Sequence, residues 1–126
     1  MIVLDTSVLI DALCGDMDSE PAIRAALKRR EQLVLPSLVL YEWLRGPRLP
    51  REIQTQEDLL PASGSLPFGP EEAAEAARLY RTLPRARGRE TDLAIAACAI
   101  TWEAELWTLN LEDFEDIPGL RVRSPH

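Results

Sequence analysis

Apolar and polar positions alternate along the chain between two kinds of stretch. Short apolar runs rich in β-forming residues are typical of buried strands, and longer runs with apolar residues at helical spacing are typical of helices. The strand-like runs cover residues 1–4, 33–35, 66–68, 106–109 and 121–123. The alternation of the two kinds predicts an α/β fold in one domain spanning residues 1–126, with a single doubly wound parallel sheet and helices on both faces.

Capping residues and prolines mark where the expected helices begin. A Thr-Ser pair follows the first strand, and Ser19 with Pro21 opens the second helix. Further helices are predicted at 38–44 after Ser37, at 50–60, from 70 to about 83, and at 92–100 after Thr91, with a turn and a short helix at 110–116.

Composition and targeting signals restrict the class of protein. Hydrophobic residues make up 46% of the 126 residues, which is a globular value. The chain enters a strand at once, without a basic leader, and no apolar run approaches the ~20 residues that span a bilayer, so we expect a cytoplasmic protein that does not enter the membrane. Cys14 and Cys98 are far apart in sequence, which favours reduced thiols over a disulfide or a zinc site.

The charge pattern gives two opposing indications about nucleic acid. A net charge of −7 argues against such a partner, whereas thirteen of the fourteen basic residues are Arg, the side chain best suited to bidentate phosphate contacts. Three of them, Arg85, Arg87 and Arg89, lie in one predicted loop and are candidate RNA contacts. A solvated connector explains the loop equally well, and a genome that prefers Arg codons explains the general bias.

Four acidic residues stand out by their position in the pattern. Asp5 ends the first strand, Asp92 begins the small-residue helix, and Asp113 follows the fourth strand. Glu42 lies in a helix that reads as apolar on all sides, which predicts burial, and a buried carboxylate needs a cation or a proton.

Each of these acids also has a structural explanation. Glu42 is spaced to pair with Arg45, and Asp92 is placed to interact with a helix dipole. Asp113 is also explained as an ordinary acid in the first turn of a short helix, and Asp5 as the cap of the helix that follows it. Glu90 is interpreted as a surface acid. It lies two residues before Asp92, and residues two apart on a helix do not share a face.

A doubly wound sheet with strand order 3-2-1-4-5 would bring the four acids together. Strands one and four are then neighbours where the winding reverses, and ligand crevices open there, outside the carboxyl ends of the strands. Clustered carboxylates cannot all stay ionised without compensation, and hard oxygen ligands favour Mg²⁺ or Mn²⁺ over zinc.

Four sequence blocks resemble the PIN domain, and more narrowly the VapC toxins of toxin–antitoxin pairs. They are residues 5–10, Tyr41 with Glu42, residues 92–97, and residues 108–114 with 117–120. The likeness extends over essentially the whole chain, with the blocks in the family's order. The resemblance implies the strand order above and a metal-dependent ribonuclease with Asp5, Glu42, Asp92 and Asp113 as catalytic residues and metal ligands. It also implies that Thr6, Ser7 and Asn110 support the site, that the protein is a homodimer, and that a VapB-like antitoxin blocks the cleft. Leu109 departs from the polar or basic residue often found there, which puts the choice of RNA in doubt.

The residues that the chain lacks limit the mechanism. The only histidine is His126, the last residue, so neither a His-based ribonuclease nor a Ser-His-Asp site has a candidate base. Hydrolysis of RNA by metal-activated water is the expected reaction, and it leaves a 5′-phosphate and a 3′-hydroxyl.

Two alternatives stay open. One is a metal-dependent phosphatase with a strand-end aspartyl nucleophile, although Ser7 stands where such sites usually carry a second aspartate. The other is a catalytically silent PIN-like module that only binds partners. For the dimer interface the sequence suggests Trp43, Leu44 and residues 50–60.

Overall fold

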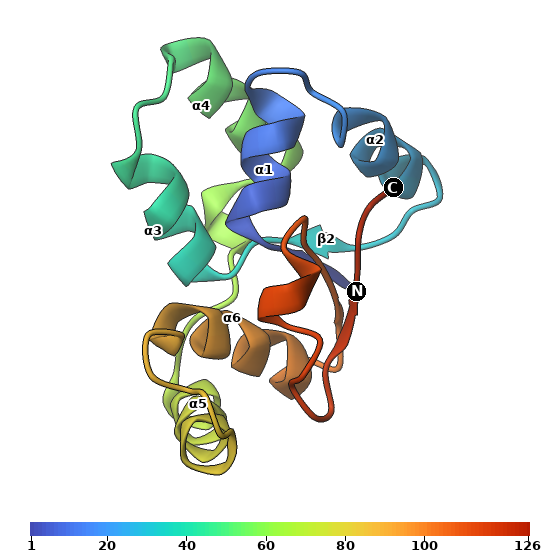
Figure 1. The fold of residues 1–126 in the computed structure, drawn as a ribbon. Helices are drawn as coiled ribbons and strands as arrows, with labels where there is room; N and C mark the ends of the chain where they lie inside the picture. Colours follow the sequence, from blue (N-terminus) through green and yellow to red (C-terminus); the bar gives the residue numbers. More distant parts are fainter.

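A four-stranded parallel sheet lies at the centre of the structure, a computed structural model that describes residues 1–126 (Figure 1). The strands are β1 (Ile2–Leu4), β2 (Leu33–Val34), β3 (Glu105–Trp107) and β4 (Arg121–Arg123), in the order β2-β1-β3-β4. All three residues of β1 are buried, as expected for a strand that is covered on both faces. Its Val3 pairs with Val34 on one side and with Leu106 on the other.

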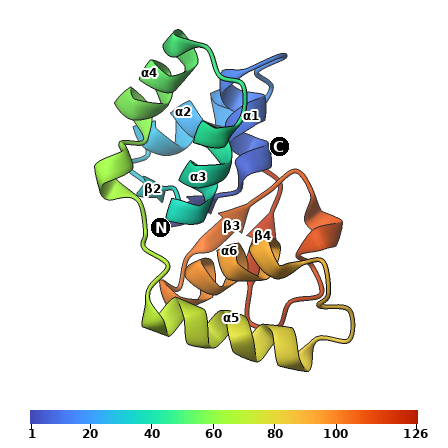
Figure 2. The ribbon, with the colours of Figure 1, turned by 90° about the vertical axis from the view of Figure 1, so that its left-hand side faces the viewer.

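Helices flank this sheet, so the predicted α/β class is confirmed (Figures 1 and 2). Both views place α5 against the outer side of α6, away from the sheet. The helices are α1 (Thr6–Leu13), α2 (Glu20–Lys28), α3 (Ser37–Arg45), α4 (Pro50–Leu59), α5 (Pro70–Thr82) and α6 (Glu90–Thr101), with 3₁₀ turns η1 (Ala62–Gly64) and η2 (Leu111–Asp113).

The predicted third strand at residues 66–68 is not formed, so the order 3-2-1-4-5 loses its outermost strand. Only one isolated parallel bridge, between Pro36 and Leu66, extends the sheet on the β2 side. Pro67 has no N–H to continue a ladder, and Phe68 is exposed. The remaining strands keep the predicted relative order, with the first and fourth runs paired at the centre.

Helix α3 is not apolar on all sides, contrary to the prediction. Only Val39 and Trp43 are buried in it, whereas Tyr41 and Leu44 are 60% and 49% exposed. The helix is therefore amphipathic and lies at the surface, and Trp43 belongs to the core rather than to an interface. Glu42 is half-buried and in contact with solvent, so full burial does not explain its presence.

Helix α6 is the most deeply buried helix. The seven residues 93–99 are all buried, and most are small, which lets the helix approach the sheet and α5 closely. It begins at Glu90, earlier than predicted, with Arg89 rather than Thr91 as the residue before it. Asp92 thus lies in its first turn, at the end that faces η2.

A cluster of 27 buried apolar residues joins the sheet to the helices. It includes Leu4, Val8 and Leu9 at the start of the chain and Phe114 and Ile117 near its end, which holds η2 against the rest of the molecule. None of the helices has the length and apolar character that a membrane span requires.

Candidate active site

Asp5 lies at the carboxyl end of the central strand and is 5% exposed. Its main-chain N–H donates to the Trp107 carbonyl at 2.9 Å, and its own carbonyl accepts the first hydrogen bonds of α1. The side chain makes no capping hydrogen bond to the helix, although Asp5 occupies the cap position. The carboxylate is therefore not accounted for as a helix cap.

Two hydroxyls hold the Asp5 carboxylate in place. Thr108 Oγ1 donates to Asp5 Oδ2 at 2.8 Å, and Ser7 Oγ donates to the same oxygen at 2.9 Å. Each hydroxyl oxygen in turn accepts from the loop after β3, because Leu109 N lies 3.1 Å from Ser7 Oγ and Asn110 N lies 3.0 Å from Thr108 Oγ1. Oδ1 of Asp5 receives no hydroxyl donor.

Glu42 reaches the site from α3. Thr6 Oγ1, one residue after Asp5, donates to Glu42 Oε1 at 2.7 Å. The other carboxylate oxygen lies 3.6 Å from Arg45 Nη2, so the pairing considered from the sequence is also present. Arg45 is exposed, and a surface pair of this kind contributes only ~0–1 kcal/mol. Glu42 therefore accepts the hydrogen bond from Thr6 and pairs with Arg45 at the same time.

Asp92 carries the largest electrostatic perturbation among the four acids. Burial and repulsion from Asp5, Asp113 and Glu42, in that order, raise its pKa to about 6, against a smaller opposing effect of Arg89. Repulsion from all three other acids means that the four side chains share one electrostatic environment.

Burial also raises the pKa of the Asp5 carboxyl, with a smaller contribution from Glu42. The hydrogen bonds from Thr108 and Ser7 act in the opposite direction, because they stabilise the ionised form. The two hydroxyls thus favour the ionised carboxylate, against the effect of burial.

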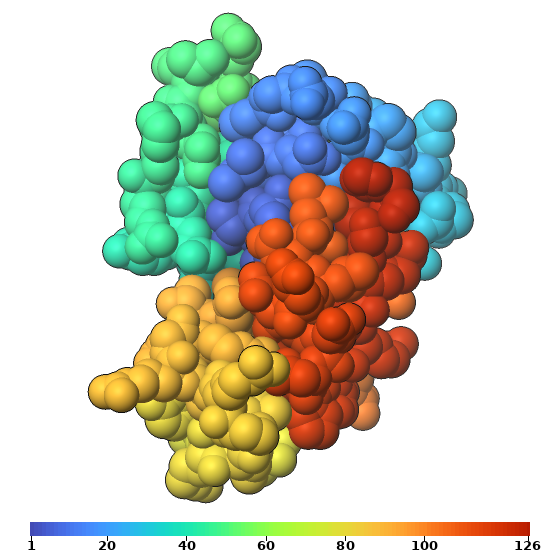
Figure 3. Space-filling view, in the orientation of Figure 1, coloured from blue at the N-terminus to red at the C-terminus, as the bar shows by residue number.

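Asp113 and the predicted supporting residue Asn110 lie on or beside η2 and are exposed. Their segment follows β3 directly and therefore borders the end of β1. Figure 3 shows the surface of this C-terminal segment (orange) in contact with that of the N-terminal segment (blue). Segments a hundred residues apart in sequence thus meet at the site.

The predicted arginine loop lies next to Asp113. Arg85, Arg87 and Arg89 line an open hollow of about 390 Å³ together with four acids of the η2 region, Glu112, Asp113, Glu115 and Asp116. Arg85 and Arg87 are exposed and form no ion pair, whereas Arg89 binds Asp116 through both guanidinium nitrogens, at 2.9 and 2.6 Å. The loop conformation depends on Gly88, whose φ of +85° a larger residue rarely adopts.

The donor set fits a hard divalent cation. The four side chains offer only carboxylate oxygens, and no cysteine or histidine lies among them. Arg89 offsets their charge only in part, because the pKa of Asp92 remains raised. No three acidic, histidine or cysteine side chains are close enough to hold a metal ion together in this arrangement.

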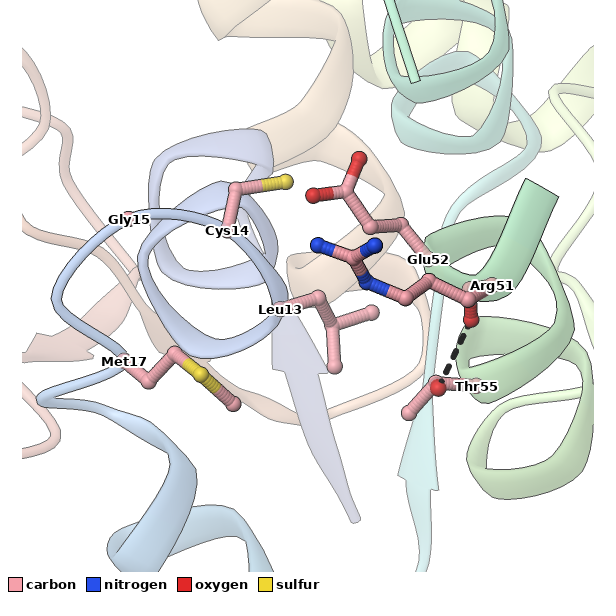
Figure 4. Close-up of a pocket in the computed structure, with 7 residues that line it drawn as sticks. All are labelled: Leu13, Cys14, Gly15, Met17, Arg51, Glu52 and Thr55. Carbon is pink, nitrogen blue, oxygen red and sulfur yellow. Dashed lines mark hydrogen bonds between the residues drawn. The ribbon is translucent and has the colours of Figure 1, made fainter. Parts of the chain in front are cut away.

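A separate cavity lies between the end of α1 and the start of α4 and contains none of the four acids (Figure 4). The Cys14 sulfur points toward the Glu52 carboxylate there, and burial and this neighbour raise the pKa of the thiol. Burial raises the pKa of Cys98 to about 11. Both cysteines are free thiols, as predicted, and neither has the lowered pKa of a nucleophile.

Two residues of the site environment were not identified from the sequence. Thr108 is fully buried and holds Asp5, and a polar residue at the end of an apolar strand was the available signal. Asp116, the partner of Arg89, had no signal, because nothing in the sequence relates residues 27 positions apart. His126 contacts Ser19 Oγ at 3.2 Å and none of the four acids.

The fold and this acidic edge of the sheet define an α/β domain with a carboxylate site. The chain belongs to the PIN domain family, whose model matches residues 2–120. PIN domains are generally nucleases, often with divalent metals. No protein with a curated description matches the chain.

Solved structures with the same fold include toxin–antitoxin complexes. The chain resembles one in VapBC from Salmonella typhimurium bound to DNA, with 23% identity over 99% of this chain and 98% of that one and a TM-score of 0.80. A chain in VapBC2 from Rickettsia felis bound to a promoter DNA fragment is 24% identical over 98% of each chain, with a TM-score of 0.74. One in FitAcB from Neisseria gonorrhoeae is 22% identical over 99% of this chain and 98% of that one, with a TM-score of 0.71. At these identities the likeness establishes the fold.

Proposed function

We propose that the protein is a metal-dependent endoribonuclease whose site consists of Asp5, Glu42, Asp92 and Asp113. The observation that carries the proposal is that burial, and after it repulsion from Asp5, Asp113 and Glu42, raises the pKa of Asp92 to about 6. Such repulsion is relieved when a divalent cation binds, and the oxygen-only donor set favours Mg²⁺, with Mn²⁺ as a substitute.

A bound Mg²⁺ would supply a water of lowered pKa as the nucleophile and would offset charge on the phosphate. The residues of the chain prepare the site for it. Thr108 and Ser7 favour the ionised form of Asp5 and orient its carboxylate, and Thr6 donates to Glu42 at the same edge. Asn110 lies beside Asp113 with an exposed side chain that is free to contact RNA or a water.

Arg85 and Arg87 are proposed to contact the RNA backbone. Their guanidinium groups are exposed, form no ion pair and border Asp113. They provide local positive charge that the net charge of −7 does not. Arg89 was predicted to share this role, but its donors already serve Asp116 and the Asp113 carbonyl.

We further propose that the protein acts as a VapC-like toxin in the cytoplasm and is held inactive by a VapB-like antitoxin. The PIN family membership and the likeness to chains of VapBC complexes support this role. The exposed apolar side chains of α3 and α4, including Tyr41, Leu44 and Ile53, suit protein contacts, either with an antitoxin or in a homodimer.

Cleavage of a mixed RNA pool by the purified protein tests the proposal. We expect cleavage with Mg²⁺ or Mn²⁺, products with a 5′-phosphate, and complete loss with a chelator or with Asp5→Asn. Asp58→Asn is the matched control, because Asp58 is an exposed aspartate on α4 that contacts only Gln54. Cleavage that survives both chelator and Asp5→Asn would refute the metal site.

The same preparations separate the two alternatives. A phosphatase would release inorganic phosphate from a phosphomonoester and leave internal RNA bonds intact. A silent binding module would cleave neither substrate under any metal, while still binding a partner.

A further inference from the structure

The guanidinium of Arg89 joins the two segments that carry Asp92 and Asp113. Nη1 and Nη2 donate to the two carboxylate oxygens of Asp116 at 2.9 and 2.6 Å. Nη2 also donates to the main-chain carbonyl of Asp113 at 2.8 Å. One side chain therefore binds Asp113 itself and a residue three positions beyond it.

The backbone of Arg89 is fixed at the start of α6. Its N–H donates to the Ala86 carbonyl at 3.0 Å, and its carbonyl accepts from Leu93 N at 2.9 Å. The side chain is only 19% exposed, and Nη1 lies 3.3 Å from the Arg85 carbonyl. The guanidinium is thus rigidly related to Asp92, which lies three residues later in the first helical turn.

Apart from Arg89, few side chains of other elements restrain the η2 segment near Asp113. The turn is three residues long, and no side chain caps it. Phe114 and Ile117 anchor the residues after it in the core, while the Asp113 side chain projects from the surface. The contact with Arg89 is the one side-chain hydrogen bond that reaches the main chain of Asp113 from another element.

We propose that Arg89 is a positioning residue that sets the separation of Asp92 and Asp113 by binding Asp116 and the Asp113 carbonyl, and that it does not contact RNA. The inference rests on the proposed function, since it concerns the geometry of the same acidic site. Arg suits this task because its planar fork bonds both oxygens of one carboxylate and still reaches a carbonyl, which the single ammonium of Lys cannot do.

The consequence of losing this contact concerns metal affinity more than RNA affinity. Residues that orient the ligands of a metal typically change metal affinity or activity by ~10–100-fold when they are replaced. Arg89→Ala and Asp116→Asn are each expected to raise the half-saturating Mn²⁺ concentration about tenfold or more and to lower kcat. The double variant should be no worse than Arg89→Ala alone, because the guanidinium that Asp116 binds is already absent in that variant.

Titration of Mn²⁺ without RNA, followed by electron paramagnetic resonance, gives a measure independent of cleavage. The KM for RNA at saturating Mn²⁺ is expected to stay within about twofold of the unsubstituted protein. Arg89→Lys should recover less than half of the lost Mn²⁺ affinity. The matched control is Arg78→Gln, which removes an exposed Arg–Glu75 pair on α5, remote from the acids, and should leave Mn²⁺ binding unchanged.

Thermal melts establish that each variant is folded. If Arg89→Ala does not fold, Asp116→Asn replaces it in the test, because Asp116→Asn leaves the guanidinium in place. A raised KM for RNA with unchanged Mn²⁺ affinity would overturn the inference and make Arg89 an RNA contact. The Asp5→Asn variant distinguishes failure of the proposed function from failure of the inference about Arg89. Cleavage by Asp5→Asn defeats the proposed function, whereas an inactive Asp5→Asn beside unaltered Mn²⁺ binding by Arg89→Ala and Asp116→Asn defeats only the role of Arg89.

Discussion

The hydroxyl of Thr108 donates to Asp5 Oδ2 at 2.8 Å and so connects the ends of two neighbouring parallel strands. Both residues are buried, and the carboxylate would be costly there without such donors. The parallel pairing of β1 with β3 is what brings a residue at position 108 beside a residue at position 5.

Thr108→Val keeps the shape of this side chain and removes its hydroxyl. A hydrogen bond to a charged group is worth ~1.5–3 kcal/mol, so the pKa of Asp5 should rise further. For the proposed nuclease we expect activity at pH 7 to fall about tenfold or more and the acidic limb of its pH profile to move to higher pH. Thr108→Ser, which retains the hydroxyl, should behave like the unsubstituted protein, and a normal profile for Thr108→Val would contradict the role of this hydrogen bond.

The raised pKa of Asp92 predicts how the stability of the metal-free protein depends on pH. Its pKa is raised from 3.8 to about 6 in the folded protein. The unfolded chain therefore ionises first as pH rises, so the contribution of Asp92 to stability is complete below about pH 4 and is lost by about pH 6 to 7. In the Asp92→Asn variant this loss is absent, while cleavage is abolished.

Chemical denaturation of the metal-free protein between pH 4 and 7.5 measures this effect. At pH 7.5 Asp92→Asn should be more stable than the unsubstituted protein, and each kcal/mol gained corresponds to ~4 °C in melting temperature. Added Mg²⁺ should stabilise the unsubstituted protein and not the variant. A variant that is less stable at pH 7.5 would show that Asp92 is favourably paired.

Arg45→Gln tests whether the salt bridge explains Glu42. The pair is exposed, so we expect the free energy of unfolding to change by less than ~1 kcal/mol. Release of Glu42 from Arg45 should lower the half-saturating Mg²⁺ concentration of the nuclease, by up to about fivefold. Glu42→Gln should instead abolish metal-dependent activity. Loss of activity in Arg45→Gln would indicate that the pair itself is required.

Arg85 and Arg87 are expected to add to RNA affinity through the backbone. For single-stranded nucleic acid, each phosphate contact contributes ~0.7 to the slope of log K against log salt. Replacing both residues by Gln should therefore reduce that slope by about 1.4 and leave Mn²⁺ affinity unaltered. Arg78→Gln combined with Arg81→Gln, both on the exposed side of α5, is the control of equal charge change. An unchanged slope would indicate a solvated connector.

The sequence alone determined the α/β class and singled out the candidate acids, because both depend on local patterns. Alternating strand and helix periods require a parallel sheet, and a carboxylate directly after an apolar strand is visible without coordinates. The order of the central strands also followed, with help from the resemblance of four blocks to one family. Free cysteines followed from their wide spacing.

Only the tertiary structure decided what each side chain contacts. Helix α3 read as buried, yet Tyr41 and Leu44 face solvent, because hydrophobicity alone does not tell which face meets the core. The run at 66–68 does not form a strand, although its composition is apolar. It is short, Pro67 has no N–H for a ladder, and only the bridge between Leu66 and Pro36 pairs it with the sheet. Arg89 looked like its neighbours in the loop, and only the folded chain brings Asp116 to it. Hydrogen bonds between residues a hundred positions apart depend on the packing of the whole domain, and the local pattern of the sequence does not contain them.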